Sequence, residues 1–163
     1  MEMEQQWPAI KRVFRNAFAS SLHYAIASVD EAGLPHVTPI GSLLLLEPGV
    51  GVYFEEFTRQ LPRQGECGGK VCVLAVDSSR WFWIKSLFRG SFKQAPALRL
   101  YGSLGQRRDA TEVELALWRR RVRKARHSKG YALMWQHMHQ VREIRFTHME
   151  PVRIGEMTRG LWT

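Results

Sequence analysis

The sequence has 163 residues, 45% of them hydrophobic and 24% charged, with 24 lysines and arginines against 15 acidic residues. This length and composition predict a single domain over residues 1–163 with a buried core, and no apolar run approaches the roughly 20 residues that span a bilayer. The net charge of +9 leaves three kinds of partner open: nucleic acid, an anionic membrane surface and an anionic small ligand.

The start of the chain and its cysteines add two expectations. The start, MEMEQQW, carries acidic residues and no apolar core, which differs from a signal peptide and favours a cytoplasmic protein. Cys67 and Cys72 flank a pair of glycines, a spacing that matches neither a zinc site nor a disulfide framework. Two free thiols are therefore expected.

The first part of the chain predicts a helix and then three strands. Apolar residues at helical spacing indicate an amphipathic helix over 7–19: Trp7, Ile10, Phe14 and Phe18. The run HYAIASVD predicts a strand over 23–30, and the turn signal after it favours a hairpin with the next strand. That next strand, over 37–47, is apolar enough to be buried on both faces. A turn at 47–49 favours its pairing with a third strand over 50–54.

Two further strands enclose a segment that is rich in aromatic residues. The run KVCVLAVD predicts a central strand over 70–77, and ALRLYGSLGQ predicts another over 97–106. Between them, residues 78–96 mix tryptophan and phenylalanine with lysine and arginine in an irregular pattern. Such a segment forms a subunit contact or a lid, or packs in the core, and both interpretations stay open.

The last part of the chain predicts two helices and a final strand. A helix begins at Thr111, because Glu112 and Glu114 suit the positive end of a helix dipole. A short helix over 131–139 and a strand over 141–155, interrupted at Pro151, follow. The first helix continues into a basic segment, which contains Arg119, Arg120, Arg121, Arg123, Lys124, Arg126 and Lys129. Charge runs on helices are usually solvated faces, and no DNA-reading motif accompanies this one, so nucleic acid is an unlikely partner.

The order of these elements predicts the fold class. A helix, a run of antiparallel strands, further helices and a final strand indicate an α+β protein that is mainly antiparallel β. Six strands in such an order favour a barrel with flanking helices.

Common catalytic signatures are missing from the sequence. It has no Gly-rich phosphate loop of the Walker or Rossmann type and no G-x-S-x-G elbow. His137 and His139 lack a third ligand at metal-site spacing, so no metal is expected. Glu55 and Glu56 are adjacent at a strand end and point to opposite sides, which argues against a paired acid and base.

A polar turn after the 50–54 strand offers groups that bind phosphate. The Thr58 hydroxyl, the Arg59 and Arg63 guanidinium groups and free backbone N–H groups are convergent donors of the kind that a phosphate dianion needs. A plain connection between a strand and a helix has the same composition, so both interpretations stay open.

Three motifs in this order resemble the pyridoxamine 5'-phosphate oxidase-like, FMN-binding split β-barrel proteins. They are H-x-x-x-P-I-G-S-L from His36, V-Y-F-x-x-x-T-R-x-x-x-R from Val52 and K-V-C-V-L-A-V-D from Lys70. The resemblance runs over about residues 20–163 and includes the ending G-x-M-T-x-G. It implies a six-stranded split barrel and a small flavin-dependent oxidoreductase, with FMN between the subunits of a homodimer and a small molecule as substrate. Because no apolar run could span a bilayer, no membrane is expected as a partner.

The resemblance also implies roles for individual residues. One strand would line the flavin ring with Val37, Thr38, Pro39, Ile40, Gly41 and Ser42, and Phe54 and Glu55 would flank the ribityl chain. The following turn would hold the phosphate with Thr58, Arg59, Gln60 and Arg63, where Gln60 stands at a position at which lysine is common. Relatives of the same barrel use a deazaflavin coenzyme or bind haem, so a deazaflavin, a haem and a non-redox binding protein are the alternatives.

Overall fold

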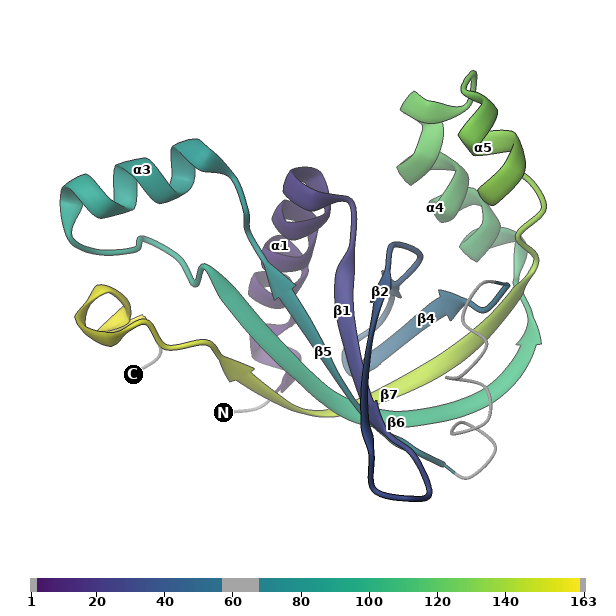
Figure 1. The fold of residues 1–163 in the computed structure, drawn as a ribbon, viewed down its shortest axis with the longest axis horizontal. Helices are drawn as coiled ribbons and strands as arrows, with labels where there is room; N and C mark the ends of the chain where they lie inside the picture. Colours follow the sequence, from purple (N-terminus) through teal and green to yellow (C-terminus); the bar gives the residue numbers. More distant parts are fainter. Residues whose placement is uncertain (1–2, 57–67, 162–163) are drawn as a thin grey trace.

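The computed structural model describes residues 3–56 and 68–161 (Figure 1). The helices in these residues are α1 (Met3–Ser21), α3 (Arg80–Arg89), α4 (Glu112–Val122), α5 (Lys129–Met134) and the short 3-10 helices η1 (Arg123–Ala125) and η2 (Gly155–Thr158). The strands are β1 (Tyr24–Val29), β2 (Pro35–Ile40), β3 (Leu44–Leu45), β4 (Val50–Phe54), β5 (Lys70–Val76), β6 (Ala97–Asp109) and β7 (Gln140–Pro151).

The strands of the described residues form one seven-stranded sheet in the order β2-β1-β5-β6-β7-β4-β3, and each recorded pairing is antiparallel. The prediction of an α+β protein that is mainly antiparallel β is therefore confirmed. The predicted hairpin between the first two strands is also confirmed, because β1 and β2 pair from Tyr24 opposite Ile40 to Val29 opposite Pro35.

The prediction of one strand over 37–47, buried on both faces, is wrong. The run divides into β2 and β3, which lie at opposite edges of the sheet, and this division makes seven strands of the expected six. The chain changes course at Gly41, where a Cβ atom would lie only 2.9 Å from the Leu22 carbonyl oxygen. β2 pairs with β1 alone and contains two prolines, Pro35 and Pro39, which lack the N–H that a central strand needs.

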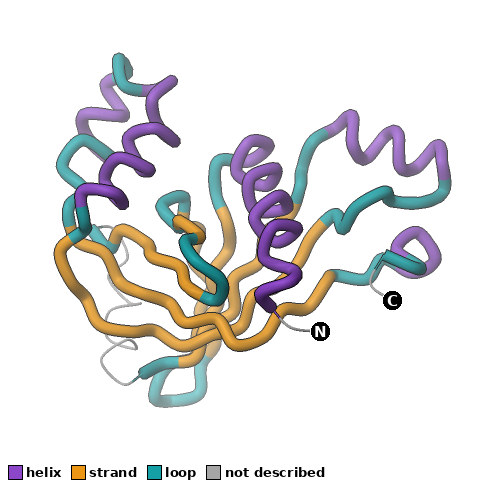
Figure 2. The backbone as a smooth tube through the Cα atoms, turned by 180° about the vertical axis from the view of Figure 1, so that it is seen from behind, coloured by secondary structure: helices purple, strands orange, loops and turns teal. Residues whose placement is uncertain are grey.

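One face of the sheet packs against α1 (Figure 2). Alternate side chains of the central strands point to this inner face, because successive residues of a strand project to opposite sides. The core there joins α1 to strands that are distant in sequence: Trp7, Ile10, Phe14, Tyr24, Ile26, Ile40, Leu43, Tyr53, Val73, Leu100, Ile144 and Phe146. Ile40 comes from β2 at one edge of the sheet, whereas Leu43, which precedes β3, and Tyr53 of β4 come from the other edge. The core around α1 therefore joins the two edges of a curved sheet.

A second core covers the other face, but only over β3, β4 and β7. There α4 and the segment after α5 pack on the strands through Leu44, Val52, Phe54, Trp118, Val122, Met138 and Val141. Trp118 makes aromatic contacts with Phe54 at 5.5 Å and with Trp135 at 6.1 Å between ring centroids. The helix expected over 131–139 is shorter than predicted, since α5 ends at Met134 and turns lead to β7.

Helix α4 begins at Thr111, as the sequence predicts. Thr111 accepts a hydrogen bond from the Glu114 backbone N–H, and the Glu114 carboxylate accepts one from the Thr111 N–H, which completes a capping box. The predicted solvated basic face needs one correction. Arg121 donates a hydrogen bond to the Leu43 carbonyl oxygen, and its guanidinium lies 4.7 Å from the centre of the Phe18 ring. Arg121 therefore ties α4 to the barrel interior.

The irregular segment expected at 78–96 contains the regular helix α3. Ser79 precedes it, and Gly90 ends it in the left-handed conformation, with a φ of 74° and hydrogen bonds to the carbonyls of Leu87 and Ser86. Figure 1 shows α3 at the opposite end of the molecule from α4 and α5. In the described part of the chain, no helix combines the length and the apolar character that crossing a membrane requires.

Candidate functional site

Over β2, β1, β5 and β6, the face of the sheet that turns away from α1 has no hydrophobic core packed on it by the residues that the structure describes. Strand register aligns its side chains in rows, and one row runs from Val37 through Ala27, Cys72 and Tyr101 to His148. The side chain of Val37 is 69% exposed, and Ala27, Cys72 and Tyr101 are half-buried. We call this surface the open face. Exposed apolar side chains such as Val37 on an uncovered sheet face are found at binding interfaces.

The residues predicted to line a flavin ring divide between the open face and the interior. Val37 and Pro39 are exposed on the open face, and Thr38 is half-buried on the other side of β2. Ile40 belongs to the inner core. The Ser42 hydroxyl is buried and exchanges hydrogen bonds with the backbone N–H and carbonyl of Phe54, each at 3.1 Å. Ser42 therefore links the end of β4 to the segment between β2 and β3.

The residues predicted to flank a ribityl chain are buried. Phe54 packs against Trp118 in the second core. Glu55 has only 1% of its side chain exposed and accepts hydrogen bonds from Arg142, with 2.6 Å between Nε and Oε1 and 3.3 Å between Nη2 and Oε2. The Glu55 side chain therefore closes one end of the barrel interior.

A second arginine, which is partly exposed, also contacts the buried Glu55 carboxylate. Arg107 has half of its side chain exposed, and its Nε lies 3.3 Å from Glu55 Oε2. The Tyr53 hydroxyl also approaches Glu55, and burial together with this carboxylate raises the pKa of Tyr53. The carboxylate thus holds two guanidinium groups in place at the end of β4, one of which, Arg107, reaches solvent.

Glu56 follows Glu55 and faces a different partner, as the sequence predicts. Its Oε1 atom accepts hydrogen bonds from the backbone N–H groups of His139 and Gln140. The residues predicted to grip a phosphate, Thr58, Arg59, Gln60 and Arg63, lie outside the described residues. Before this segment, Glu56 lies beside the start of β7. After it, the Gly69 carbonyl accepts a hydrogen bond from Leu104 N.

Polar residues that the sequence analysis did not single out occupy the β6 and β7 side of the open face. The Tyr101 hydroxyl donates to Glu150 Oε2 at 2.8 Å, and Arg99 lies 3.7 Å from the same carboxylate. The hydrogen bond to Glu150 is the main cause that raises the pKa of Tyr101 to about 12. Alternation in the two strands could have placed Arg99, Tyr101 and Ser103 on one face, but their partners on β7 depend on the register.

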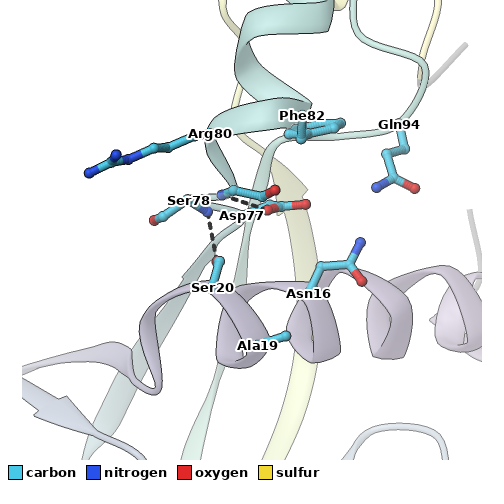
Figure 3. A pocket seen from close by; sticks show the side chains of 9 residues that line it. Asn16, Ala19, Ser20, Asp77, Ser78, Arg80, Phe82 and Gln94 are labelled. Carbon is cyan, nitrogen blue, oxygen red and sulfur yellow. Dashed lines mark hydrogen bonds between the residues drawn. The ribbon is translucent and has the colours of Figure 1, made fainter.

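A separate hollow of about 570 Å³ lies between α1 and the start of α3 (Figure 3). Its lining consists of Asn16, Ala19, Ser20, Asp77, Ser78, Ser79, Arg80, Phe82 and Gln94. The Ser20 hydroxyl accepts a hydrogen bond from Ser78 N, and Asp77 Oδ1 accepts one from Ser79 N (Figure 3). The first bond joins α1 to the segment that leads into α3, and the second is local to that segment. The hollow shares no lining residue with the predicted site.

Comparisons with known proteins give the fold. No protein-family model and no curated protein match this sequence. Among solved structures, a candidate pyridoxamine 5'-phosphate oxidase from Lactobacillus delbrueckii is 19% identical, with a TM-score of 0.51 over 86% of this chain and 90% of that one. An FMN-binding protein from Syntrophomonas wolfei is 15% identical, with a TM-score of 0.52 over 92% and 94%.

A third structure, an F420 reductase, is 13% identical, with a TM-score of 0.53 over 84% of this chain and 95% of that one. Solved structures that share the architecture thus include proteins named for binding FMN and for acting on F420. The resemblance that the three sequence motifs indicate is confirmed at the level of the fold: the chain has the split β-barrel fold of these solved structures.

Proposed function

We propose that this protein binds FMN between the subunits of a homodimer and acts as a small flavin-dependent oxidoreductase. The observation that carries the proposal is the exposure of Val37 and Pro39 on the open face. These residues belong to the motif that resembles the flavin-lining strand, and an apolar sheet edge offers the flat contact that a flavin ring needs.

The charges near the end of β4 fit an anionic cofactor. Arg107 is half-exposed, and Glu55, which also pairs with Arg142, holds it beside the point where the predicted phosphate turn begins. In this proposal Thr58, Arg59 and Arg63 supply the remaining donors to the phosphate, with Gln60 as a neutral neighbour. Arg107 is an additional candidate for this role, beyond the residues that the motif indicates.

The open face also fits a second copy of the chain. Its rows of small and apolar side chains, such as Ala27, Cys72 and Leu74, leave room for close packing. In an isologous dimer each Val37 would lie near the partner's open face, and the cofactor would be enclosed from both sides. Bound FMN supplies the electron-transfer chemistry, and the protein orients it and excludes water.

The test is the absorption spectrum of the purified protein and a titration of apo protein with FMN, followed by flavin fluorescence. We expect a flavin spectrum or binding at micromolar FMN. The double variant Arg59→Ala/Arg63→Ala should weaken binding by at least about tenfold, since each charge-assisted bond to phosphate contributes about 1.5 to 3 kcal/mol. The control is Arg119→Ala/Arg120→Ala, which removes two exposed arginines of α4 and should leave the affinity unchanged.

The same titration separates the alternative cofactors. Uptake of a deazaflavin without FMN would favour a deazaflavin-dependent protein, for which the likeness to an F420 reductase is the supporting observation. A Soret band on addition of haem, with no flavin uptake, would favour a haem-binding protein without redox activity. Equal FMN affinity of the arginine variant and the wild type would refute the phosphate role of Arg59 and Arg63.

A further inference from the structure

Helix α3 exposes an apolar strip that the proposed function does not use. Trp81, Ile84, Leu87 and Phe88 are 72%, 41%, 63% and 91% exposed. At 3.6 residues per turn, these four side chains fall within an arc of about 120° on the helix. They therefore form one continuous strip along its length.

The opposite side of α3 is held firmly. Phe82 and Trp83 contact the Phe92 ring at 5.5 Å and 5.1 Å between centroids, and the Ser86 hydroxyl is bonded to the Phe82 carbonyl. Phe92 in turn donates its backbone N–H to the carbonyl oxygen of Met157 in η2. Because this buried side fixes the rotation of the helix, the strip faces solvent in a defined orientation.

The segment that carries the strip contains basic residues and no acidic residue. The segment 78–96 contains Arg80, Lys85, Arg89 and Lys93 and no aspartate or glutamate. Each of these four side chains is exposed. Arg80 lies at the start of α3, Arg89 is its last residue, Lys85 follows the edge of the strip and Lys93 is in the loop after it.

We propose that α3 binds the surface of an anionic phospholipid bilayer. An apolar strip with cationic flanks is the pattern of helices that lie in the membrane interface, and an indole ring favours that depth. Clustered lysines and arginines near the surface attract anionic headgroups. Such binding needs no spanning helix, and it is independent of the proposed cofactor because α3 lies away from β2 (Figures 1 and 2).

The charges favour this occupant over a second copy of the chain. A symmetric contact between two α3 helices would bring eight cations together without a compensating carboxylate from the same segments. An anionic lipid surface neutralises all of these cations while it takes up the apolar strip.

The experiment is flotation of the full-length protein with vesicles. We expect binding to an equimolar mixture of phosphatidylcholine and phosphatidylglycerol, with much less binding to phosphatidylcholine alone, and a decrease with rising salt. The variant Trp81→Ser/Phe88→Ser should reduce the bound fraction by at least about tenfold, because it removes the two largest exposed rings of the strip. Circular dichroism and the melting temperature verify that this variant is folded.

Matched variants distinguish the strip from general surface properties. Leu133→Ser removes an apolar side chain of α5 that is 81% exposed, and Arg119→Gln/Arg120→Gln removes two cations of α4. Both should bind like the wild type. The proposal is overturned if the wild type does not float, if the Trp81/Phe88 variant binds equally well, or if a control loses as much binding. A further contradicting outcome concerns Trp81→Ser/Phe88→Ser. The proposal is overturned if this variant leaves flotation unchanged but converts a dimer to a monomer in sedimentation without lipid.

Discussion

Arg142 on β7 and Glu55 at the end of β4 form a buried ion pair, with 2.6 Å between Nε and Oε1, across 87 positions of the sequence. Neither side chain has more than 5% of its surface exposed. We expect Arg142→Met to lower the free energy of unfolding by about 3 to 5 kcal/mol, because the Glu55 carboxylate is left buried without its closest partner. Urea denaturation measures this loss.

Two control variants sharpen this prediction. Arg107→Met removes the half-exposed partner of Glu55 and should cost no more than about 1 kcal/mol. The double variant Glu55→Leu/Arg142→Met removes both buried charges and should be more stable than Arg142→Met alone. If Arg142→Met and Arg107→Met cost the same, the buried pair is not the main support of this end of the barrel.

The carboxylate of Glu114 makes stability depend on pH. Arg108 donates to it at 2.7 Å and 2.9 Å, and this hydrogen bonding holds the pKa of Glu114 below its usual value. A lowered pKa means that the stabilisation is complete above the unfolded-state pKa of about 4.3 and is lost as the pH falls through the lower folded-state pKa. We expect Glu114→Gln to cost about 1 to 3 kcal/mol at neutral pH.

The check is urea denaturation of both proteins at a series of pH values. The stability difference between wild type and Glu114→Gln should shrink as the solution is acidified below about pH 4.3. Glu112→Gln, an exposed change in the same helical turn, should show a small difference throughout. A difference for Glu114→Gln that stays constant down to acid pH would contradict the role of its charge.

Gly102 lies where β6 and β7 shift register, and a side chain there has no room. A Cβ atom at this position would lie 2.3 Å from the Arg145 carbonyl oxygen. Gly102→Ala should therefore lower the free energy of unfolding by about 1 to 3 kcal/mol, measured from the thermal transition. Gly130→Ala is the control, because the nearest atom to its new Cβ would be the Ser128 hydroxyl oxygen at 3.9 Å. This change should be neutral or should stabilise α5 by up to about 1 kcal/mol.

The open face can be tested with two valines of equal exposure. Val37 on β2 and Val113 on α4 are both 69% exposed, but only Val37 belongs to the open face. In the proposed homodimer, Val37→Asp places a charge in the apolar interface and should shift the protein toward monomer by at least about tenfold in dissociation constant. Sedimentation equilibrium measures this shift. Val113→Asp should leave the mass distribution unchanged. If Val37→Asp also leaves it unchanged, the open face is not the subunit contact.

The sequence by itself determined the elements that have local causes. Thr111 and Glu114 are three residues apart and form a capping box wherever that helix lies, and the alternation in β1 and β5 assigns one side of each strand to a core. The turn after Asp30 and the hairpin of β1 with β2 could be predicted for the same reason. The motifs around Val37 and Lys70 also indicated the split barrel, because the sequence itself gives the order in which the strands follow one another along the chain.

Only the tertiary structure decided which side chains reach the surface and which partners they have. Val37 is exposed because it points to the open face, whereas Ile40 of the same strand points to the inner core. The local apolar run gives no sign that the chain turns away at Gly41. Glu55 pairs with Arg142, and Arg121 reaches Leu43, through the curvature of a sheet that brings distant residues together. Strand alternation specifies the side of a residue, whereas register and curvature set its neighbours, and these depend on the packing of the whole chain.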